Sequence, residues 1–367
     1  MRFALLDSLP IWGGGQKWCV QAATALGKRG HRPLIVCARG SALAERARAA
    51  GLDHQAFAFS GARAIGTAFA LRRLVRHERV RVVVSNVGRD LRLGALACAG
   101  SSARLVQRRG IARPIPRDPL SRWLYARRVE RVITNSAAVR ARMLHGAEFV
   151  DPARFVVIEN GIDTHTAPGG DRSRVRRELG LSADVPVAGA IGRLSPMKGH
   201  AHLLEAFARA RKRVPGAALL VAGAGEEEEA LRRLARELGL EGSVYFLGFR
   251  HDVDDVLATL DVFVLASVRD EGCNNALLEA MWHRLPAVVS RCGGLSEPVV
   301  DGQTGILVPV ADPGAMAMAL GSLLSDPAER ARLGAAGHQH IARCYSLARA
   351  TDAFEELLRG LAAAPME

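Results

Sequence analysis

The chain has 367 residues, 49% of them apolar, and a formal net charge of +13. Because a single hydrophobic core usually stops growing near roughly 250–300 residues, we expect two domains, and the apolar content excludes a disordered chain. No apolar run approaches the roughly 20 residues of a membrane span, the N-terminus lacks a signal-peptide pattern, and the six scattered cysteines include no C-x-x-C pair. These features are typical of a cytoplasmic protein without disulfides or a zinc site.

The first half of the chain alternates short β-branched runs with amphipathic stretches. We predict strands at Arg2–Leu6, Pro33–Cys37, Val80–Ser85, Ala103–Gln107 and Arg131–Asn135, and helices at Gly15–Lys28 and Arg63–Arg76. Strands that alternate with helices predict a parallel sheet covered by helices on both faces.

The second half repeats this pattern. We predict strands at Val187–Ile191, Ala218–Ala222, Ser243–Leu247, Val262–Leu265 and Ala287–Ser290, and helices at His200–Val214, Glu226–Leu238, Ala276–His283 and Pro313–Leu324. The expected fold class is therefore α/β, with two doubly wound, Rossmann-like domains that face each other across a cleft. In such sheets ligands bind outside the carboxyl ends of the strands.

A segment rich in Gly, Pro, Asp and Thr, residues 159–174, suits a linker between these domains. The predicted domains are residues 1–164, on the acceptor side, and residues 165–346, which would bind a nucleotide. A last helical stretch, Leu347–Leu361, opens the segment 347–367. It either completes the second domain or crosses back to the first.

The stretch IGRLSPMKGH (191–200) follows a predicted strand and opens a helix. Arg193 and Lys198 lie in this turn, and Gly192 and Gly199 allow the backbone to approach a ligand closely. Two cations beside a helix N-terminus indicate an anion site. The alternative is that both are surface residues of an ordinary loop between strand and helix.

The stretch SVRDEGCNNALLEAM (267–281) has the same placement and contains two acids eight positions apart. Glu271 would repel a phosphate, so it is better suited to accept hydrogen bonds from sugar hydroxyls, and Glu279 to accept them from a ribose. Backbone N–H groups at the start of the helix would meet the diphosphate between them; they belong to Gly272, Cys273, Asn274 and Asn275. The pattern favours a nucleotide-sugar ligand. The alternative gives Glu271 a role at the helix dipole and Glu279 an exposed position.

At this point the chain resembles the retaining glycosyltransferases of family 4, which have the GT-B fold and an E-x7-E signature. The resemblance rests on seven motifs in the expected order: GGGQKW (13–18), ENGID (159–163), GRLSPMKG (192–199), VAGAGEE (221–227), FLGFRHDV (246–253), EGCNNALLE (271–279) and CGGLSEPVVDGQTGILV (292–308). It covers nearly the whole chain, and the R-x4-K pattern ahead of the two acids makes it specific.

The resemblance implies a role for each matching residue. Arg193 and Lys198 would hold the donor diphosphate and stabilise the departing nucleotide, while Glu271 would contact the transferred sugar; these three are the expected catalytic residues. Glu279 would contact the ribose. Four further residues are implied in donor binding: Gly14 and Gly15, which would close over the phosphates, and Phe249 and Arg250, which would border the base. No cofactor or metal is expected, because the paired cations supply the positive charge.

The first domain departs from the family pattern. Many relatives carry a histidine that faces the sugar, where this chain has Gly110 in LVQRRGIARP, and Asn86 replaces another frequent histidine. We therefore assign no general base; in some relatives the donor phosphate itself is thought to take that role.

Positive charge is concentrated in the first half. Residues 1–150 contain 27 Lys and Arg against 8 Asp and Glu, whereas residues 151–367 contain 23 against 29. This asymmetry favours an anionic partner, and Ile111–Arg131 mixes arginines with Leu120, Trp123, Leu124 and Tyr125 in the manner of a basic amphipathic helix. We expect peripheral association with the inner face of the cytoplasmic membrane. The alternative is a core-packed helix with solvated arginines.

The expected activity is transfer of a hexosyl group from a nucleotide-diphosphate sugar to a glycan or lipid-linked acceptor in lipopolysaccharide or other surface-polysaccharide synthesis. Two alternatives stay open: a nucleotide-sugar epimerase or hydrolase of the same fold, and a basic nucleic-acid-binding protein. The first half lacks the interleaved aromatic residues of a stacking platform, so no nucleic-acid partner is expected.

Overall fold

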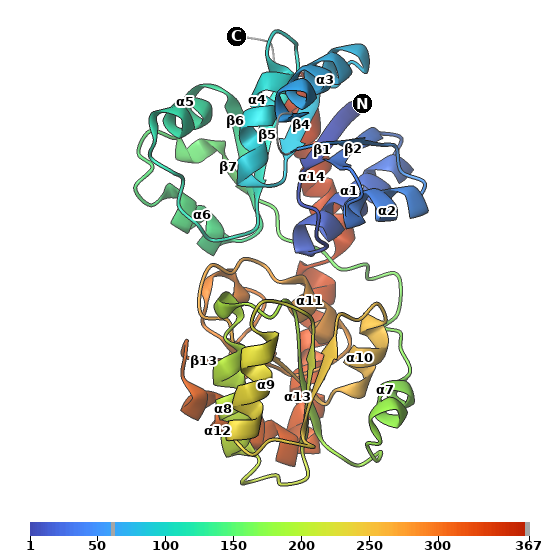
Figure 1. The fold of residues 1–367 in the computed structure, drawn as a ribbon, viewed down its shortest axis with the longest axis vertical. Coiled ribbons are helices and arrows are strands. Elements are labelled where there is room, and N and C mark those ends of the chain that lie inside the picture. The colour runs from blue at the N-terminus through green and yellow to red at the C-terminus, as the bar shows by residue number, and fades with distance from the viewer. Residues whose placement is uncertain (60–62, 364–367) are drawn as a thin grey trace. The chain divides into compact units, whose positions relative to one another are not determined.

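The computed structural model describes residues 1–59 and 63–363 (Figure 1). The chain divides into two compact units. The first unit contains residues 1–160 and the C-terminal segment from Ala348, and the second unit contains Gly161–Leu347. Each unit is a parallel sheet with helices on both faces, which is the α/β class that the sequence predicts.

The first unit has a seven-stranded sheet in the order β3-β2-β1-β4-β5-β6-β7. Every pairing is parallel. The strands are β1 (Arg2–Asp7), β2 (Arg32–Ala38), β3 (His54–Phe57), β4 (Val82–Ser85), β5 (Arg104–Arg109), β6 (Val129–Thr134) and β7 (Phe155–Val157). The strand order reverses between β1 and β4, which is where ligands of such sheets bind.

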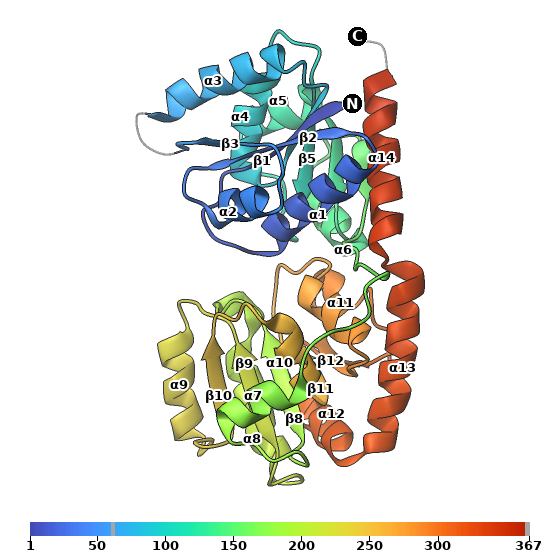
Figure 2. The same cartoon turned by 90° about the vertical axis from the view of Figure 1, so that its right-hand side faces the viewer.

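Two helical layers cover this sheet. The helices are α1 (Gly14–Lys28), α2 (Ala42–Ala49), α3 (Arg63–His77), α4 (Leu91–Cys98), α5 (Pro119–Arg127), α6 (Ala137–Leu144) and α14 (Leu347–Ala363). Helices α1, α2 and α14 share one apolar core, and α3 to α6 share the other. Figure 2 shows α3 and α14 on opposite sides of the sheet.

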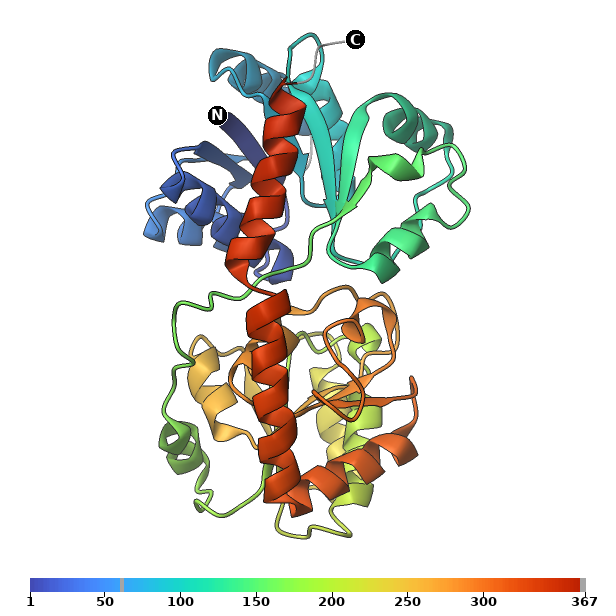
Figure 3. The ribbon, with the colours of Figure 1, turned by 180° about the vertical axis from the view of Figure 1, so that it is seen from behind.

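Helix α14 packs on the first unit although it ends the chain (Figure 3). Phe354 lies edge-on to Phe3, with ring centroids 6.1 Å apart. The Glu355 carboxylate pairs with His31 at 2.8 Å and accepts a hydrogen bond from Arg29 at 2.7 Å, and these contacts lower the pKa of Glu355 to about 2. An aromatic contact with β1 and an ion cluster with the segment between α1 and β2 thus join α14 to the first unit.

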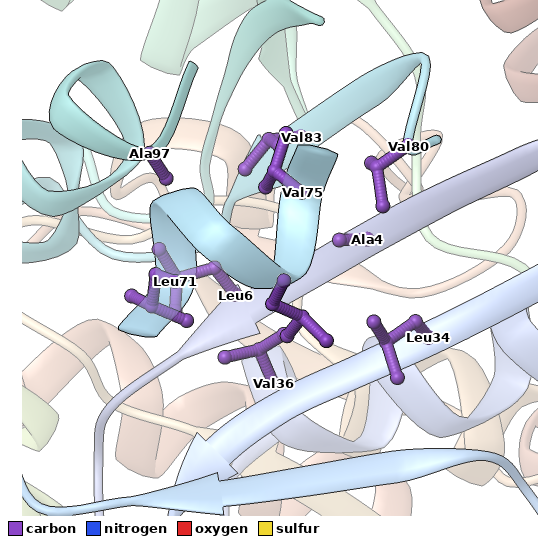
Figure 4. A pocket seen from close by; sticks show the side chains of 10 residues that line it. Ala4, Leu6, Leu34, Val36, Leu71, Val75, Val80, Val83 and Ala97 are labelled. Carbon is purple, nitrogen blue, oxygen red and sulfur yellow. The ribbon is translucent and has the colours of Figure 1, made fainter. Parts of the chain in front are cut away.

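A small apolar void lies between α3 and the sheet (Figure 4). Its volume is about 10 Å³, and aliphatic side chains such as Leu6, Val36 and Leu71 line it. A water molecule needs roughly 10–15 Å³ and two to four polar partners. The void is therefore part of the core packing and offers no ligand site.

The second unit has a six-stranded sheet in the order β10-β9-β8-β11-β12-β13. The strands are β8 (Val187–Ile191), β9 (Ala218–Ala222), β10 (Val244–Gly248), β11 (Val262–Leu265), β12 (Ala287–Ser290) and β13 (Ile306–Val308). Their pairings are all parallel, and the order reverses between β8 and β11.

Helices again form two layers on this second sheet. They are α7 (Arg172–Leu179), α8 (His200–Ala210), α9 (Glu228–Glu237), α10 (Val253–Thr259), α11 (Asn275–Trp282), α12 (Pro313–Ser325) and α13 (Pro327–Cys344). Helices α8, α9 and α12 contribute to one core, and α7, α10, α11 and α13 contribute to the other.

Candidate active site

The loops that follow β8 and β11 meet at the point where the strand order of the second unit reverses. The Val268 N–H donates to the Met197 carbonyl oxygen at 2.9 Å, which joins the two loops through their backbones. Gly199 has φ +63°, and a Cβ there would overlap the Ala266 carbonyl oxygen. Only glycine allows this approach, so the local sequence fixes how closely the loops pack.

Lys198 and Glu271 form an ion pair where these loops meet. Lys198 Nζ bonds to Glu271 Oε1, and both side chains are largely buried, with 17% and 8% of their surface exposed. Ser267 Oγ donates to the same carboxylate oxygen at 2.8 Å, and Ser290 Oγ donates to the Ser267 carbonyl oxygen at 2.6 Å. Lys198 and Ser267 thus both donate to the Glu271 carboxylate. Removal of either Lys198 or Glu271 would leave the charge of the other buried and unpaired.

A third loop, after β12, fixes the backbone of Glu271. The Gly294 N–H donates to the Glu271 carbonyl oxygen at 3.0 Å. Gly293 has φ +54°, and a Cβ there would overlap the same oxygen. Gly293 and Gly294 are not among the predicted site residues; the available signal was a glycine pair in the short loop that follows a predicted strand.

Arg193 is not brought together with this ion pair by any side-chain contact in the described structure. Its guanidinium pairs instead with Glu226 at 3.0 Å, and both side chains are more than half exposed. The predicted loop is nevertheless close-packed, because Gly223 and Gly225 admit the carbonyl oxygens of Gly192 and Leu194. An exposed ion pair contributes only about 0–1 kcal/mol, so a phosphate can readily displace Glu226 from Arg193.

A buried histidine that the sequence analysis did not select supports the Arg193 loop. His200 Nε2 lies 3.3 Å from the Arg193 carbonyl oxygen, and the side chain is buried at the start of α8. Burial lowers the pKa of His200 to about 4, so the ring is neutral near pH 7. A neutral ring adds no charge beside Lys198 and acts as a support of the backbone.

Helix α11 begins directly after the loop that carries Glu271. Asn274 is its N-cap, and the side-chain oxygen accepts from the Leu277 N–H at 3.3 Å. Gly272 and Cys273 before it are buried, and Asn275 opens the helix, one residue earlier than predicted. Glu279 lies on the second turn and is half-buried. The predicted residues are thus contiguous around one helix N-terminus.

The loop after β10 carries the two residues expected at the base. Phe249 is 52% exposed and lies edge-on to His251, with ring centroids 4.9 Å apart. Arg250 donates to both carboxylate oxygens of Glu178 and of Asp252 at 2.7–2.9 Å, and these carboxylates raise the pKa of Arg250. Its guanidinium therefore ties α7 to this loop. Asp252 precedes α10 and makes no side-chain cap.

The glycine-rich loop of the first unit is anchored by a buried carboxylate. Helix α1 begins at Gly14, and a Cβ on Gly15 would lie 2.8 Å from Asn86 Nδ2. Asp7, fully buried at the end of β1, accepts from Gln16 Nε2 at 2.7 Å and from Asn86 Nδ2 at 2.6 Å. Asn86 therefore positions the loop start, which the sequence analysis did not foresee.

Behind this loop, Arg108 is buried at the end of β5. It donates to Asn86 Oδ1 at 3.0 Å and to Asn160 Oδ1 at 2.8 Å, and its guanidinium lies 4.2 Å from the centroid of Trp18. Gly110 lies two residues further on, where a Cβ would be 3.3 Å from Asn135 Nδ2. Polar side chains from the ends of β5 and β6, Arg108 and Asn135, thus line the position of Gly110.

Asp90→Asn is expected to alter how stability depends on pH. Burial raises the pKa of Asp90 from 3.8 to about 6, with Asp7 adding to the effect and hydrogen bonds from Ser8 and the charge of Arg89 opposing it. A carboxyl whose folded pKa is raised contributes stability below its unfolded pKa and loses it as pH rises through the folded value. The variant cannot ionise, so its stability relative to wild type should rise between about pH 4 and pH 7, by roughly 3 kcal/mol at most. Urea unfolding at both pH values measures this difference, and a pH-independent difference would contradict it.

Residues 1–59 and 63–363 contain no cluster of three or more His, Cys, Asp or Glu side chains placed to hold a metal ion. Within the same residues, no helix combines the length and apolar character that a membrane crossing requires.

Two family models match the chain. Residues 171–340 match the family of glycosyl transferases group 1, and residues 12–166 match glycosyltransferase family 4. The lipopolysaccharide core biosynthesis glycosyltransferase LpsE of Rhizobium meliloti is 32% identical over 241 residues, which are 66% of this chain and 67% of that protein.

Two further relatives share shorter regions. The GDP-mannose-dependent alpha-(1-6)-phosphatidylinositol monomannoside mannosyltransferase of Mycolicibacterium smegmatis is 38% identical over 48% of this chain and 49% of its own length. The D-inositol 3-phosphate glycosyltransferase of Corynebacterium urealyticum is 34% identical over 68% of this chain and 62% of its own length. The matched region is thus about half to two thirds of each relative.

Solved structures match over nearly the whole chain. HepE of Anabaena, crystallised with UDP and glucose, superposes with a TM-score of 0.86 at 23% identity, over 98% of this chain and 99% of that one. The sucrose-phosphate synthase of Thermosynechococcus elongatus gives 0.82 at 19% identity, over 99% and 100%. At these identities the likeness concerns the fold.

These findings define a glycosyltransferase with the GT-B fold, and the chain belongs to the family 4 glycosyltransferases. The predictions of a family 4 glycosyltransferase and of two Rossmann-like α/β domains are confirmed.

Proposed function

We propose that the protein transfers a hexosyl group from a nucleotide-diphosphate sugar with retention of anomeric configuration and without a metal ion. The observation that supports this most strongly is the buried pair of Lys198 and Glu271, held on neighbouring loops at the reversal point of a parallel sheet. Such a point is where ligands of this sheet class bind, and the pair supplies a cation for a diphosphate beside an acceptor for sugar hydroxyls.

In the proposed reaction, the bond between the anomeric carbon and the diphosphate oxygen breaks, and its electron pair leaves with the nucleotide. Lys198 stabilises the charge that develops on that oxygen, and Arg193 adds a second cation once a phosphate displaces Glu226. Fixed charges in a site that excludes water act more strongly than in solvent. Glu271 accepts hydrogen bonds from the transferred sugar while its carbon becomes cation-like.

The acceptor hydroxyl then bonds to the anomeric carbon on the face that the diphosphate leaves. Its proton passes to the departing phosphate oxygen, which balances the step without a separate base. The glycine at position 110 agrees with this proposal, because it has no side chain that could take a proton. In the same scheme Glu279 contacts the ribose, the amides around Asn274 meet the diphosphate, and Gly14, Gly15 and Phe249 complete the donor site.

We propose a glycan or lipid-linked acceptor in the synthesis of lipopolysaccharide or another surface polysaccharide, at the cytoplasmic face of the membrane. Support comes from the relatives, one of which is named for the lipopolysaccharide core and another for a phosphatidylinositol mannoside. The basic first half of the chain suits an anionic membrane or acceptor.

A thermal-shift panel of UDP-, GDP- and ADP-sugars, with and without EDTA, tests the donor site. A donor present at 100 times its Kd stabilises the folded state by about 2.7 kcal/mol. We expect one nucleotide class to raise the Tm, equally with EDTA, and Lys198→Ala to reduce this shift. If no member stabilises the wild type, or if EDTA abolishes the shift, the donor or the metal-independent part of the proposal is wrong.

A further inference from the structure

Three neighbouring helices of the first unit expose large apolar side chains. Helices α3, α4 and α5 cover the same sheet face, and α4 contacts both of the others (Figure 1). Each carries at least one such residue on its outer side: Phe69 is 68% exposed, Leu96 54% and Trp123 51%. Scattered single cases are ordinary, but one on each of three adjacent helices forms a surface feature.

An exposed arginine accompanies each apolar residue. Residues four apart lie on the same side of a helix, so Arg73 lies beside Phe69, Arg92 beside Leu96 and Arg127 beside Trp123. We call these six residues the α3–α5 surface. Two further arginines around α5, Arg117 and Arg122, are also exposed, as is Leu120.

Acidic side chains do not neutralise this surface. Between residues 63 and 128 the sequence has sixteen arginines and three acids, Glu78, Asp90 and Asp118. Glu78 and Asp90 are engaged elsewhere, because Glu78 accepts from Arg2 at 2.8 Å and Asp90 is buried against Ser8. Asp118 caps α5 through Ser121, and these bonds, together with the nearby charge of Arg92, lower the pKa of Asp118, so one acid stands against the arginines of this surface. The arginines of the surface therefore face solvent with a strong excess of positive charge.

We propose that the α3–α5 surface docks on an anionic lipid bilayer. Charge complementarity selects this occupant: arginines attract anionic headgroups, while Phe, Leu and Trp enter the boundary between headgroups and acyl chains. A second copy of the chain that docked through its own α3–α5 surface would present the same positive charge and be repelled. The inference rests on the proposed function in one respect, since a lipid-linked acceptor gives the enzyme a reason to reach the membrane.

Vesicle sedimentation with the full chain tests the surface. The probes are vesicles of phosphatidylcholine alone and vesicles in which about one lipid in three is the anionic phosphatidylglycerol. We expect binding to the anionic vesicles only, with release at high salt. The variant Arg73→Gln/Arg92→Gln/Arg127→Gln should bind about 100-fold more weakly, from the contribution of each arginine near an anionic bilayer.

A second variant and a control distinguish the contribution of the apolar side chains to vesicle binding from that of the arginine charges. Phe69→Ser/Leu96→Ser/Trp123→Ser keeps the charges and should also lose binding. Met318→Ser is the matched control, because Met318 is 72% exposed on α12 of the second unit, outside the surface; it should bind like wild type. Equal binding to both vesicle types, or undiminished binding by either triple variant, would overturn the proposal. So would binding of single-stranded RNA, lost in the arginine variant, without vesicle binding.

The donor-induced thermal shift is measured on the same variants. We expect it unchanged, because none of the six residues belongs to the Lys198–Glu271 site, and this also shows that the variants are folded. If vesicle binding follows the predictions while no donor shifts the wild-type Tm, the proposed function fails and the membrane surface stands. If a donor raises the wild-type Tm while vesicle binding does not follow the predictions, the membrane proposal is wrong and the proposed sugar transfer stands.

Discussion

Replacing Lys198 with alanine is expected to lower kcat by about 10²–10³-fold, the range seen when one fixed stabiliser of a developing negative charge is removed. The ammonium group is largely buried and bonded to Glu271, so solvent cannot replace it. The loss should fall on kcat more than on KM, because the charge on the leaving diphosphate grows as its bond breaks. Steady-state transfer with the donor identified by thermal shift measures both constants.

The control for this prediction is Lys212→Ala, which removes an exposed lysine of the same unit. It should leave kcat unchanged. Lys198→Arg keeps a positive charge and is expected to recover part of the activity, although a planar guanidinium cannot reproduce a compact ammonium group. Wild-type turnover by Lys198→Ala, with folding verified by its melting curve, would refute the assignment of the diphosphate to this loop.

The central strands of the second unit were predictable to the residue because they are buried on both faces, whereas the predicted bounds of the central strands of the first unit differ by one or two residues. Strands β8, β9, β11 and β12 have the bounds that the sequence predicts, and each is a short run dominated by aliphatic residues. The unpredicted strands β3, β7 and β13 are all at sheet edges and have only three or four residues. An edge strand is covered on fewer sides, so its sequence lacks the apolar run that reveals a central strand.

The two loops of the site were predictable, but the contact between Lys198 and Glu271 was not. Glycines and charges after β8 and β11 indicate ligand loops locally, whereas the bond between Lys198 and Glu271 depends on the strand order that makes β8 and β11 neighbours. That order is a long-range property, and no local pattern contains it. The need for glycine at Gly293 is hidden for the same reason, because the oxygen it must accommodate belongs to Glu271, 22 positions earlier.

The sequence also did not predict which charged side chains pair with each other in the folded protein. The run of four glutamates at 226–229 predicts a favourable helix start, and it gives no sign that Glu226 alone pairs with Arg193. Arg250 was expected near a base, and its spacing gives no sign that Glu178 of α7 pairs with its guanidinium. Long side chains reach several neighbours, so their partners follow from the fold and not from spacing.

Replacing Glu271 and Glu279 separately is expected to give two different kinetic defects. Glu271→Ala should lower kcat by about 10²-fold or more with a small change in nucleotide affinity, since a hydrogen bond that strengthens in the transition state acts on turnover. Glu279→Ala should mainly weaken binding of the free nucleotide, by about tenfold for the loss of one charged hydrogen bond to a ribose. Titration calorimetry with the nucleoside diphosphate and steady-state kinetics with the full donor separate the two effects.

Glu271→Gln distinguishes the charge of the residue from its shape. The amide oxygen can still accept from Ser267 Oγ and Lys198 Nζ, so the packing of the loop is preserved. Lys198 then lacks its counter-charge and should hold the donor diphosphate at least as tightly as in wild type, while turnover falls because the carboxylate no longer faces the cation-like sugar. A Glu271→Gln enzyme with normal kcat and weakened nucleotide binding would reverse the roles of the two glutamates and contradict the placement of the sugar beside Glu271.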